Sequence, residues 1–77
     1  MSRTSLSNVS VREYRIILAN AGCTFIRITG GHEFWTKPGL TRPIAFQTHI
    51  NPVPERIIKQ GLTALKLTRQ EFFDLLK

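Results

Sequence analysis

Apolar residues recur at helical spacing near the start of the chain. These residues are Val11, Tyr14, Ile17, Leu18 and Ala21. Ser10 and Glu13 have the spacing of a capping box, in which the two side chains accept hydrogen bonds from each other's backbone N–H groups. Gly22 is placed to end the helix in a left-handed conformation. The pattern predicts a helix over residues 11–21.

The middle of the chain changes to the residue types and the shorter period of β-strands. Three such stretches cover residues 23–29, 32–37 and 43–49. The pair Gly30-Gly31 between the first two suits a tight hairpin turn. Pro38-Gly39 stops the second stretch, and Pro43 begins the third, where a proline removes no sheet hydrogen bond. Short connections of this kind predict a three-stranded antiparallel meander.

Helical spacing returns in the last third of the chain. Pro54 suits a first helical position, and one apolar face follows it. That face contains Ile57, Ile58, Gly61, Leu62 and Leu65. A glycine inside a helix costs about 1 kcal/mol relative to alanine, so we expect close packing against Gly61. A second capping box, Thr68 to Glu71, predicts an additional helix at about residues 69–77.

These elements predict one α+β domain with the order α-β-β-β-α and an extra C-terminal helix. A chain of 77 residues has room for a single core. We expect a flexible N-terminal tail over residues 1–9 and the domain over residues 10–77, with the helices on one face of the antiparallel sheet. The pattern leaves open whether residues 68–77 join the core or dock a partner.

The net charge indicates which binding partners the protein favours, and the cysteine content indicates its cellular compartment. Eleven Lys and Arg against five Asp and Glu give a formal charge of +6, which favours a polyanion such as RNA and also fits an acidic protein. The single cysteine, Cys23, forms no internal disulfide and is expected in the core of an intracellular protein. The polar N-terminus and the lack of long apolar runs predict a cytoplasmic chain without a signal peptide or membrane span.

No spacing of metal ligands stands out in the sequence. The Cys and His residues lack zinc-site spacing, and the five carboxylates form no cluster typical of Mg²⁺ sites. We therefore expect neither a metal nor another cofactor.

Two stretches, the basic charge and the predicted order of elements together resemble the HicA family, over about Val11 to Leu67. The stretches are "GGHEFW" (residues 30–35) and "PVPERIIKQGLTALKL" (residues 52–67). HicA proteins are small toxins of toxin–antitoxin pairs, with a fold like the double-stranded RNA-binding domain. The resemblance implies a metal-independent endoribonuclease that cleaves mRNA with the histidine after the glycine turn, here His32. It also implies a HicB-like antitoxin as partner, often acidic where it meets the toxin.

The chain departs from the family pattern at three positions. Gly31 stands where the family commonly has serine, and Glu33 stands where histidine is frequent. A carboxylate at Glu33 would raise the pKa of the neighbouring imidazole if it came close to it. Lys66 replaces a glycine after the main C-terminal helix.

Cleavage of RNA through its 2′-OH requires a general base and a general acid, and a near-neutral imidazole suits either role. His32 is the first candidate and His49 the second. If Thr36 pairs with Pro43, His49 lies diagonally from His32 on the same face, at about 7–8 Å between Cα atoms. A slip of one residue sends His49 to the other face, and the sequence leaves both registers open. It also leaves open a structural role for His49 at the end of a strand.

The remaining candidates are RNA-binding residues. Glycine backbone and cationic side chains can contact phosphates, and we assign this role to Gly30, Gly31, Arg27, Lys37 and Arg42. Phe34 and Trp35 point to opposite faces, and the outward one can stack on a base; we name Trp35 as that candidate. Two alternatives to the nuclease remain, namely a non-catalytic RNA-binding module and a basic protein-interaction domain of the same fold.

Overall fold

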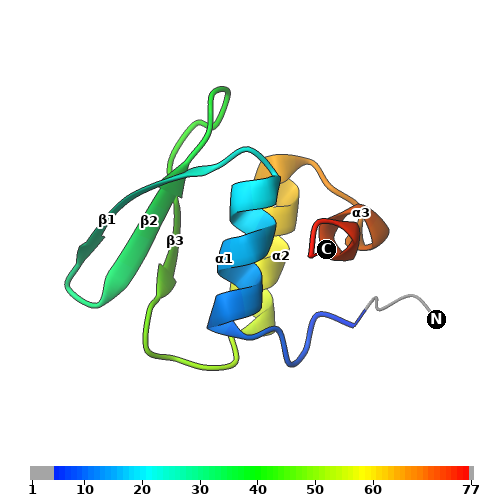
Figure 1. The fold of residues 1–77 in the computed structure, drawn as a ribbon, viewed down its shortest axis with the longest axis horizontal. Coiled ribbons are helices and arrows are strands. Elements are labelled where there is room, and N and C mark those ends of the chain that lie inside the picture. The colour runs from blue at the N-terminus through cyan, green and yellow to red at the C-terminus, as the bar shows by residue number, and fades with distance from the viewer. Residues whose placement is uncertain (1–4, 77) are drawn as a thin grey trace.

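The computed structural model describes residues 5–76 and shows a small α+β fold (Figure 1). The elements are α1 (Val11–Asn20), β1 (Thr24–Thr29), β2 (His32–Thr36), β3 (Ile44–Gln47), α2 (Glu55–Leu65) and α3 (Arg69–Asp74). The strands form one antiparallel sheet in the order β1-β2-β3. α1 and α2 lie side by side against one face of this sheet, and α3 lies on the far side of the helix pair (Figure 1). The predicted fold class and element order are confirmed.

Both predicted capping boxes form. The backbone N–H of Glu13 donates to Ser10 Oγ at 3.0 Å, and the backbone N–H of Ser10 donates to Glu13 Oε1 at 3.1 Å. Thr68 and Glu71 make the equivalent pair at the start of α3. Each capping box therefore satisfies two backbone N–H groups at the start of its helix.

The expected flexible tail over residues 1–9 is wrong for residues 5–9. Leu6 and Val9 are 2% and 0% exposed and belong to the core. The backbone N–H of Val53 donates to the carbonyl of Val9 at 2.8 Å, which ties this segment to the loop before α2. The apolar side chains at these two positions are what hold the segment down. Residues 1–4 lie outside the described residues.

The C-terminal helix is part of the core. Phe72 and Phe73 are 0% and 7% exposed, and the Phe72 ring lies 6.1 Å from that of Tyr14 between centroids. This contact explains why α3 packs against the helix pair rather than projecting from it. Within residues 5–76, no helix has the length and apolar character needed to cross a membrane.

Gly61 is a point of close helix packing, as its place in a helix predicted. A Cβ built on Gly61 would fall in severe overlap with the hydroxyl of Tyr14 and 3.3 Å from its ring carbon Cζ. The Tyr14 side chain is fully buried, and its hydroxyl has no hydrogen-bond partner among the described residues. Burial raises the pKa of this phenol well above its ordinary value.

We predict that Gly61→Ala lowers the free energy of unfolding by about 1–2 kcal/mol. Overpacking of about 2–3 kcal/mol exceeds the roughly 1 kcal/mol that alanine gains in helix propensity. Tyr14→Phe removes the overlapping, unpartnered hydroxyl and should restore much of this loss in the double variant. Urea unfolding of the four proteins of the cycle measures the effect. Additive losses in the double variant would contradict the contact.

Lys66 ends α2 in the left-handed conformation, with φ of 57°. A side chain there costs roughly 1 kcal/mol that glycine avoids. We predict that Lys66→Gly raises the urea midpoint, corresponding to about 0.5–1 kcal/mol of added stability. Lys59→Gly, in the interior of the same helix, should lower the midpoint instead. A lowered midpoint for Lys66→Gly would show that the lysine side chain itself stabilises the helix end.

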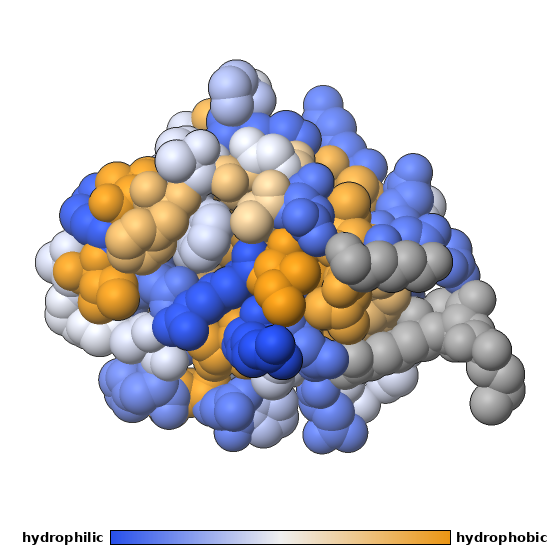
Figure 2. All heavy atoms as spheres, viewed as in Figure 1, coloured by the Kyte–Doolittle hydropathy of each residue, from blue (hydrophilic) through white to orange (hydrophobic). Residues whose placement is uncertain are grey.

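The edge strand β1 extends beyond the cover of the helices. All six of its residues are exposed, and Phe25, Ile26 and Ile28 are 46%, 39% and 54% exposed. Figure 2 shows hydrophobic atoms gathered on the left of the molecule, where β1 lies in Figure 1. The core therefore rests on β2 and β3, and β1 is held chiefly by its pairing with β2.

Candidate active site

The register between β2 and β3 decides which side chains share a face. His32 lies opposite Gln47, and Trp35 lies opposite Ile44. This is the first of the two registers considered from the sequence, the one that places His49 on the side of His32. Ile44 and Trp35 are buried against the helices, so His32, at odd spacing from Trp35, lies on the other, helix-free face.

The pairing of β1 with β2 adds a cation and an aromatic ring to this helix-free face. Arg27 lies opposite Phe34, and Thr29 lies opposite His32. The guanidinium carbon of Arg27 is 4.6 Å from the centroid of the Phe34 ring, which is a cation–π distance. A bulge at Ile26 changes the register along β1 and brings Arg27 to this face. The open face thus presents His32, Phe34 and Arg27 as neighbours.

The Gly-Gly turn borders these residues. Gly30 and Gly31 have φ of 58° and 79°, as a two-residue hairpin with two left-handed positions requires. Nothing lies within 4 Å of the position that a Cβ at Gly30 would occupy, so the turn is open to an approaching ligand. The Nδ1 atom of His32 lies 3.3 Å from the carbonyl oxygen of Gly30. The imidazole is therefore held at the turn rather than pointing freely into solvent.

His49 lies at the same turn, although β3 ends two residues earlier. The Cε1 atom of its ring lies 3.1 Å from the position that a Cβ at Gly31 would occupy. The backbone N–H of Thr48 donates to the carbonyl of Gly31 at 2.9 Å and fixes the segment there. A serine at position 31, common in the resembled family, would crowd this ring. The structure therefore brings Gly30, Gly31, His32 and His49 together.

Lys37, Arg42 and Trp35 lie away from this group. Lys37 lies at the opposite end of β2, about 16 Å along the strand from His32, with its Cε atom 3.5 Å from the Cβ position of Gly22. Arg42 precedes β3 at that same end. Trp35 is 9% exposed and lies in the core. The outward aromatic is Phe34, so the assignment of Trp35 to base stacking is wrong.

The carboxylate of Glu33 is the buried polar centre of the domain. Its residue is 1% exposed, and the guanidinium of Arg15 on α1 binds it in a two-pronged ion pair, with distances of 2.5–3.0 Å. Thr48 Oγ1 donates at 2.7 Å and the indole N–H of Trp35 at 3.0 Å. Four donors thus satisfy a group that would otherwise be costly to bury.

Glu33 belongs to the helix side of the sheet and not to the catalytic candidates. It lies on the face of β2 opposite to His32, so the approach of its carboxylate to that imidazole, considered from the sequence, does not occur. Burial raises the pKa of Glu33, but the hydrogen bonds from Arg15, Thr48 and Trp35 outweigh burial, and the net pKa is lowered. Its role is to link α1, β2 and the end of β3.

The structural role of Glu33 was not predicted from the sequence, where its position beside His32 was interpreted as a possible effect on the pKa of that imidazole. The available signal was its spacing of two residues from Trp35, because alternate residues of a strand point to the same face. The partner of this carboxylate, Arg15, lies on α1 and far from Glu33 in the sequence.

Cys23 is buried in the core, as expected, and burial raises the pKa of its thiol. Among residues 5–76, no three His, Cys, Asp or Glu side chains gather into a group that could bind a metal ion. Comparisons of the chain with protein-family models, curated proteins and solved structures found no match.

Proposed function

We propose that this protein is a HicA-like toxin, a metal-independent endoribonuclease that cleaves mRNA with His32 as its acid/base residue. The observation that carries the proposal is the helix-free face at the Gly-Gly turn, where an imidazole, a guanidinium and an outward aromatic ring lie together. These are the groups that proton transfer, phosphate binding and base stacking require.

In the proposed reaction, RNA lies across this face with a phosphate at the turn. His32 accepts the proton of a 2′-OH, and the 2′ oxygen attacks the adjacent phosphorus. The bond from phosphorus to the 5′ oxygen breaks, which leaves a 2′,3′-cyclic phosphate on one fragment. The departing 5′ oxygen takes a proton from a second group, and His49, held beside Gly31, is the candidate for it.

Arg27 and Phe34 bind the substrate in this proposal. Arg27 offsets the negative charge that develops on the phosphate oxygens. Phe34 takes the stacking role first assigned to Trp35, and the base replaces the Arg27 guanidinium over the ring when that guanidinium binds the phosphate. The open backbone at Gly30 admits the phosphate without a steric barrier. A HicB-like antitoxin is the proposed protein partner.

A non-catalytic RNA-binding module is the second candidate, and the residues on either side of His32 favour it. Gly31 offers no hydroxyl where the resembled family commonly has serine, and the Glu33 carboxylate is engaged in the structural cluster where that family frequently has histidine.

RNA cleavage with and without EDTA separates the candidates. The nuclease proposal predicts equal cleavage of a single-stranded RNA oligonucleotide in both conditions. RNA that is bound in a salt-dependent manner but stays intact in both would support the binding module. A lack of any salt-dependent RNA affinity would favour a basic protein-interaction domain and contradict the other two.

A further inference from the structure

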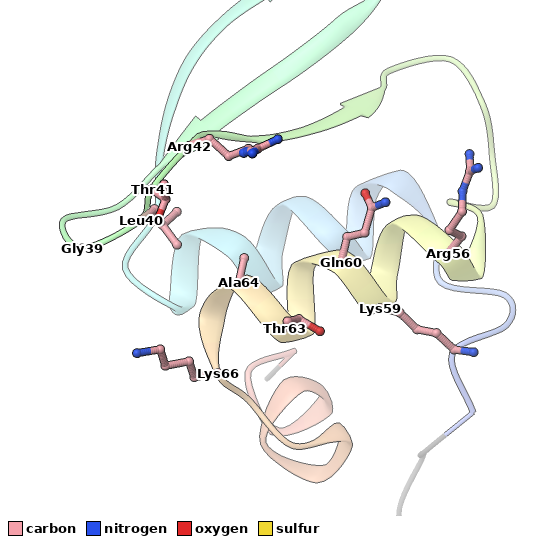
Figure 3. Close-up of a pocket in the computed structure, with 10 residues that line it drawn as sticks. All are labelled: Gly39, Leu40, Thr41, Arg42, Arg56, Lys59, Gln60, Thr63, Ala64 and Lys66. Carbon is pink, nitrogen blue, oxygen red and sulfur yellow. The ribbon is translucent and has the colours of Figure 1, made fainter.

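A groove runs between the loop that joins β2 to β3 and the exposed side of α2 (Figure 3). Its volume is 790 Å³. Leu40 from the loop and Ala64 from α2 lie on its two sides, and Figure 3 shows both directed toward the space between the loop and the helix. A second hollow of 280 Å³ continues from it along β3 and shares Arg42, Gln60 and Ala64 with it. Together they form a continuous furrow along α2.

Four cationic side chains surround the groove. Arg42 lies just before β3, Arg56 and Lys59 come from α2, and Lys66 follows α2 (Figure 3). All four are exposed, and none forms an ion pair with another described residue. No Asp or Glu is among the described residues that line the groove. The positive charge of the chain, +6 in total, is therefore concentrated around this groove.

We propose that this groove binds an acidic peptide segment of a partner protein, with carboxylates on the four cations and apolar side chains on Leu40 and Ala64. The four cations favour a negatively charged ligand, and Leu40 and Ala64 favour one that also carries apolar side chains. The described lining holds no aromatic ring on which a base could stack, so a peptide with alternating acidic and apolar residues fits it better than RNA.

The groove is separate from the candidate active site. It lies along α2 and the loop before β3, whereas His32 lies on the helix-free face at the opposite end of β2. Occupation of the groove therefore leaves the Gly-Gly turn open. The proposal does not depend on nuclease activity, because peptide binding is measured directly.

Binding of a synthetic peptide tests the proposal. The probe is a fluorescein-labelled peptide of about eight residues that alternates Glu and Leu, long enough to follow α2, which is roughly 16 Å long. Fluorescence anisotropy with the full chain should show saturable binding. Lys59→Glu should weaken the affinity at least tenfold, because it places a like charge in the groove. Leu40→Ser should weaken it about threefold or more.

Arg12→Glu is the matched control, because it makes the same change in net charge on α1, outside the groove. It should alter the affinity less than threefold. Equal weakening by Arg12→Glu and Lys59→Glu would show that binding follows net charge alone and would overturn the proposal. A peptide with Gln in place of Glu should not bind. An RNA oligonucleotide that displaces the peptide and is itself weakened by Lys59→Glu and Leu40→Ser would assign the groove to nucleic acid instead.

Discussion

Replacing His32 with alanine is expected to lower the rate of RNA cleavage by about 10²–10⁴-fold, the contribution typical of a positioned acid or base. The fold should remain intact, because His32 lies on the helix-free face and is absent from the buried core. Its one described side-chain hydrogen bond is to the Gly30 carbonyl at the turn. The measurement is single-turnover cleavage of a labelled RNA oligonucleotide, alongside thermal unfolding of the same preparation.

Thr36→Ala provides the matched control for His32→Ala. Thr36 belongs to the same strand and the same face, about 13 Å along β2 from His32. It should retain cleavage within about threefold, because the change removes no group from the turn. His49→Ala should fall between these two variants if His49 supplies the second proton. A His32→Ala protein that cleaves at the unchanged rate would remove His32 from the mechanism.

Replacing Glu33 with alanine is expected to lower the free energy of unfolding by about 3 kcal/mol. The change deprives the buried indole N–H of Trp35 of its acceptor and separates Arg15 from its partner. For a domain of this size such a loss lowers the Tm by more than about 10 °C. Glu33→Gln keeps the shape and one acceptor, so it should cost less. Glu55→Gln, at an exposed carboxylate on α2, should change the stability by only a few tenths of a kcal/mol.

The contribution of Glu33 should also depend on pH. Its pKa is lowered in the folded protein, so its charge stabilises the fold above the unfolded-state pKa of about 4.3. That stability is lost as the pH falls through the lower, folded-state pKa. The difference in urea midpoint between the unsubstituted protein and Glu33→Gln should therefore be largest near neutral pH and shrink below about pH 4. A constant difference would mean that the carboxylate is not charged in the folded protein.

Features with a local signal were predictable from the sequence. The two capping boxes and the Gly-Gly hairpin each depend on residues a few positions apart, and all of them form as predicted. The element order follows from these signals. The close approach at Gly61 was also predictable, because a glycine within a helix is unfavourable unless something occupies the space of its side chain.

Features that depend on distant parts of the chain were not predictable in the same way. Leu6 and Val9 join the core in a segment whose backbone is hydrogen-bonded to Val53, far along the sequence. Phe34 and Trp35 could not be assigned to faces until the side of the sheet that the helices cover was known. The acceptor role of Glu33 requires Arg15 on α1 to be placed over β2, which no local pattern specifies.

The groove along α2 combines both kinds of feature. The cations of α2 are visible in the sequence, but the contribution of Arg42 depends on where the segment before β3 lies relative to the helix. Arg42 was assigned from the sequence to the RNA face, and its place in the groove suggests a protein partner instead.

The chemical nature of the RNA ends tests the central claim most directly. The measurement is mass spectrometry of the fragments that the protein produces from an RNA oligonucleotide in excess EDTA. Attack by the 2′-OH with proton transfer at His32 predicts fragments that end in a 2′,3′-cyclic phosphate and begin with a 5′-hydroxyl, and it predicts that His32→Ala forms them at least about 100-fold more slowly. Fragments that carry a 3′-hydroxyl and a 5′-phosphate, or cyclic ends that His32→Ala forms at the unchanged rate, would contradict the account.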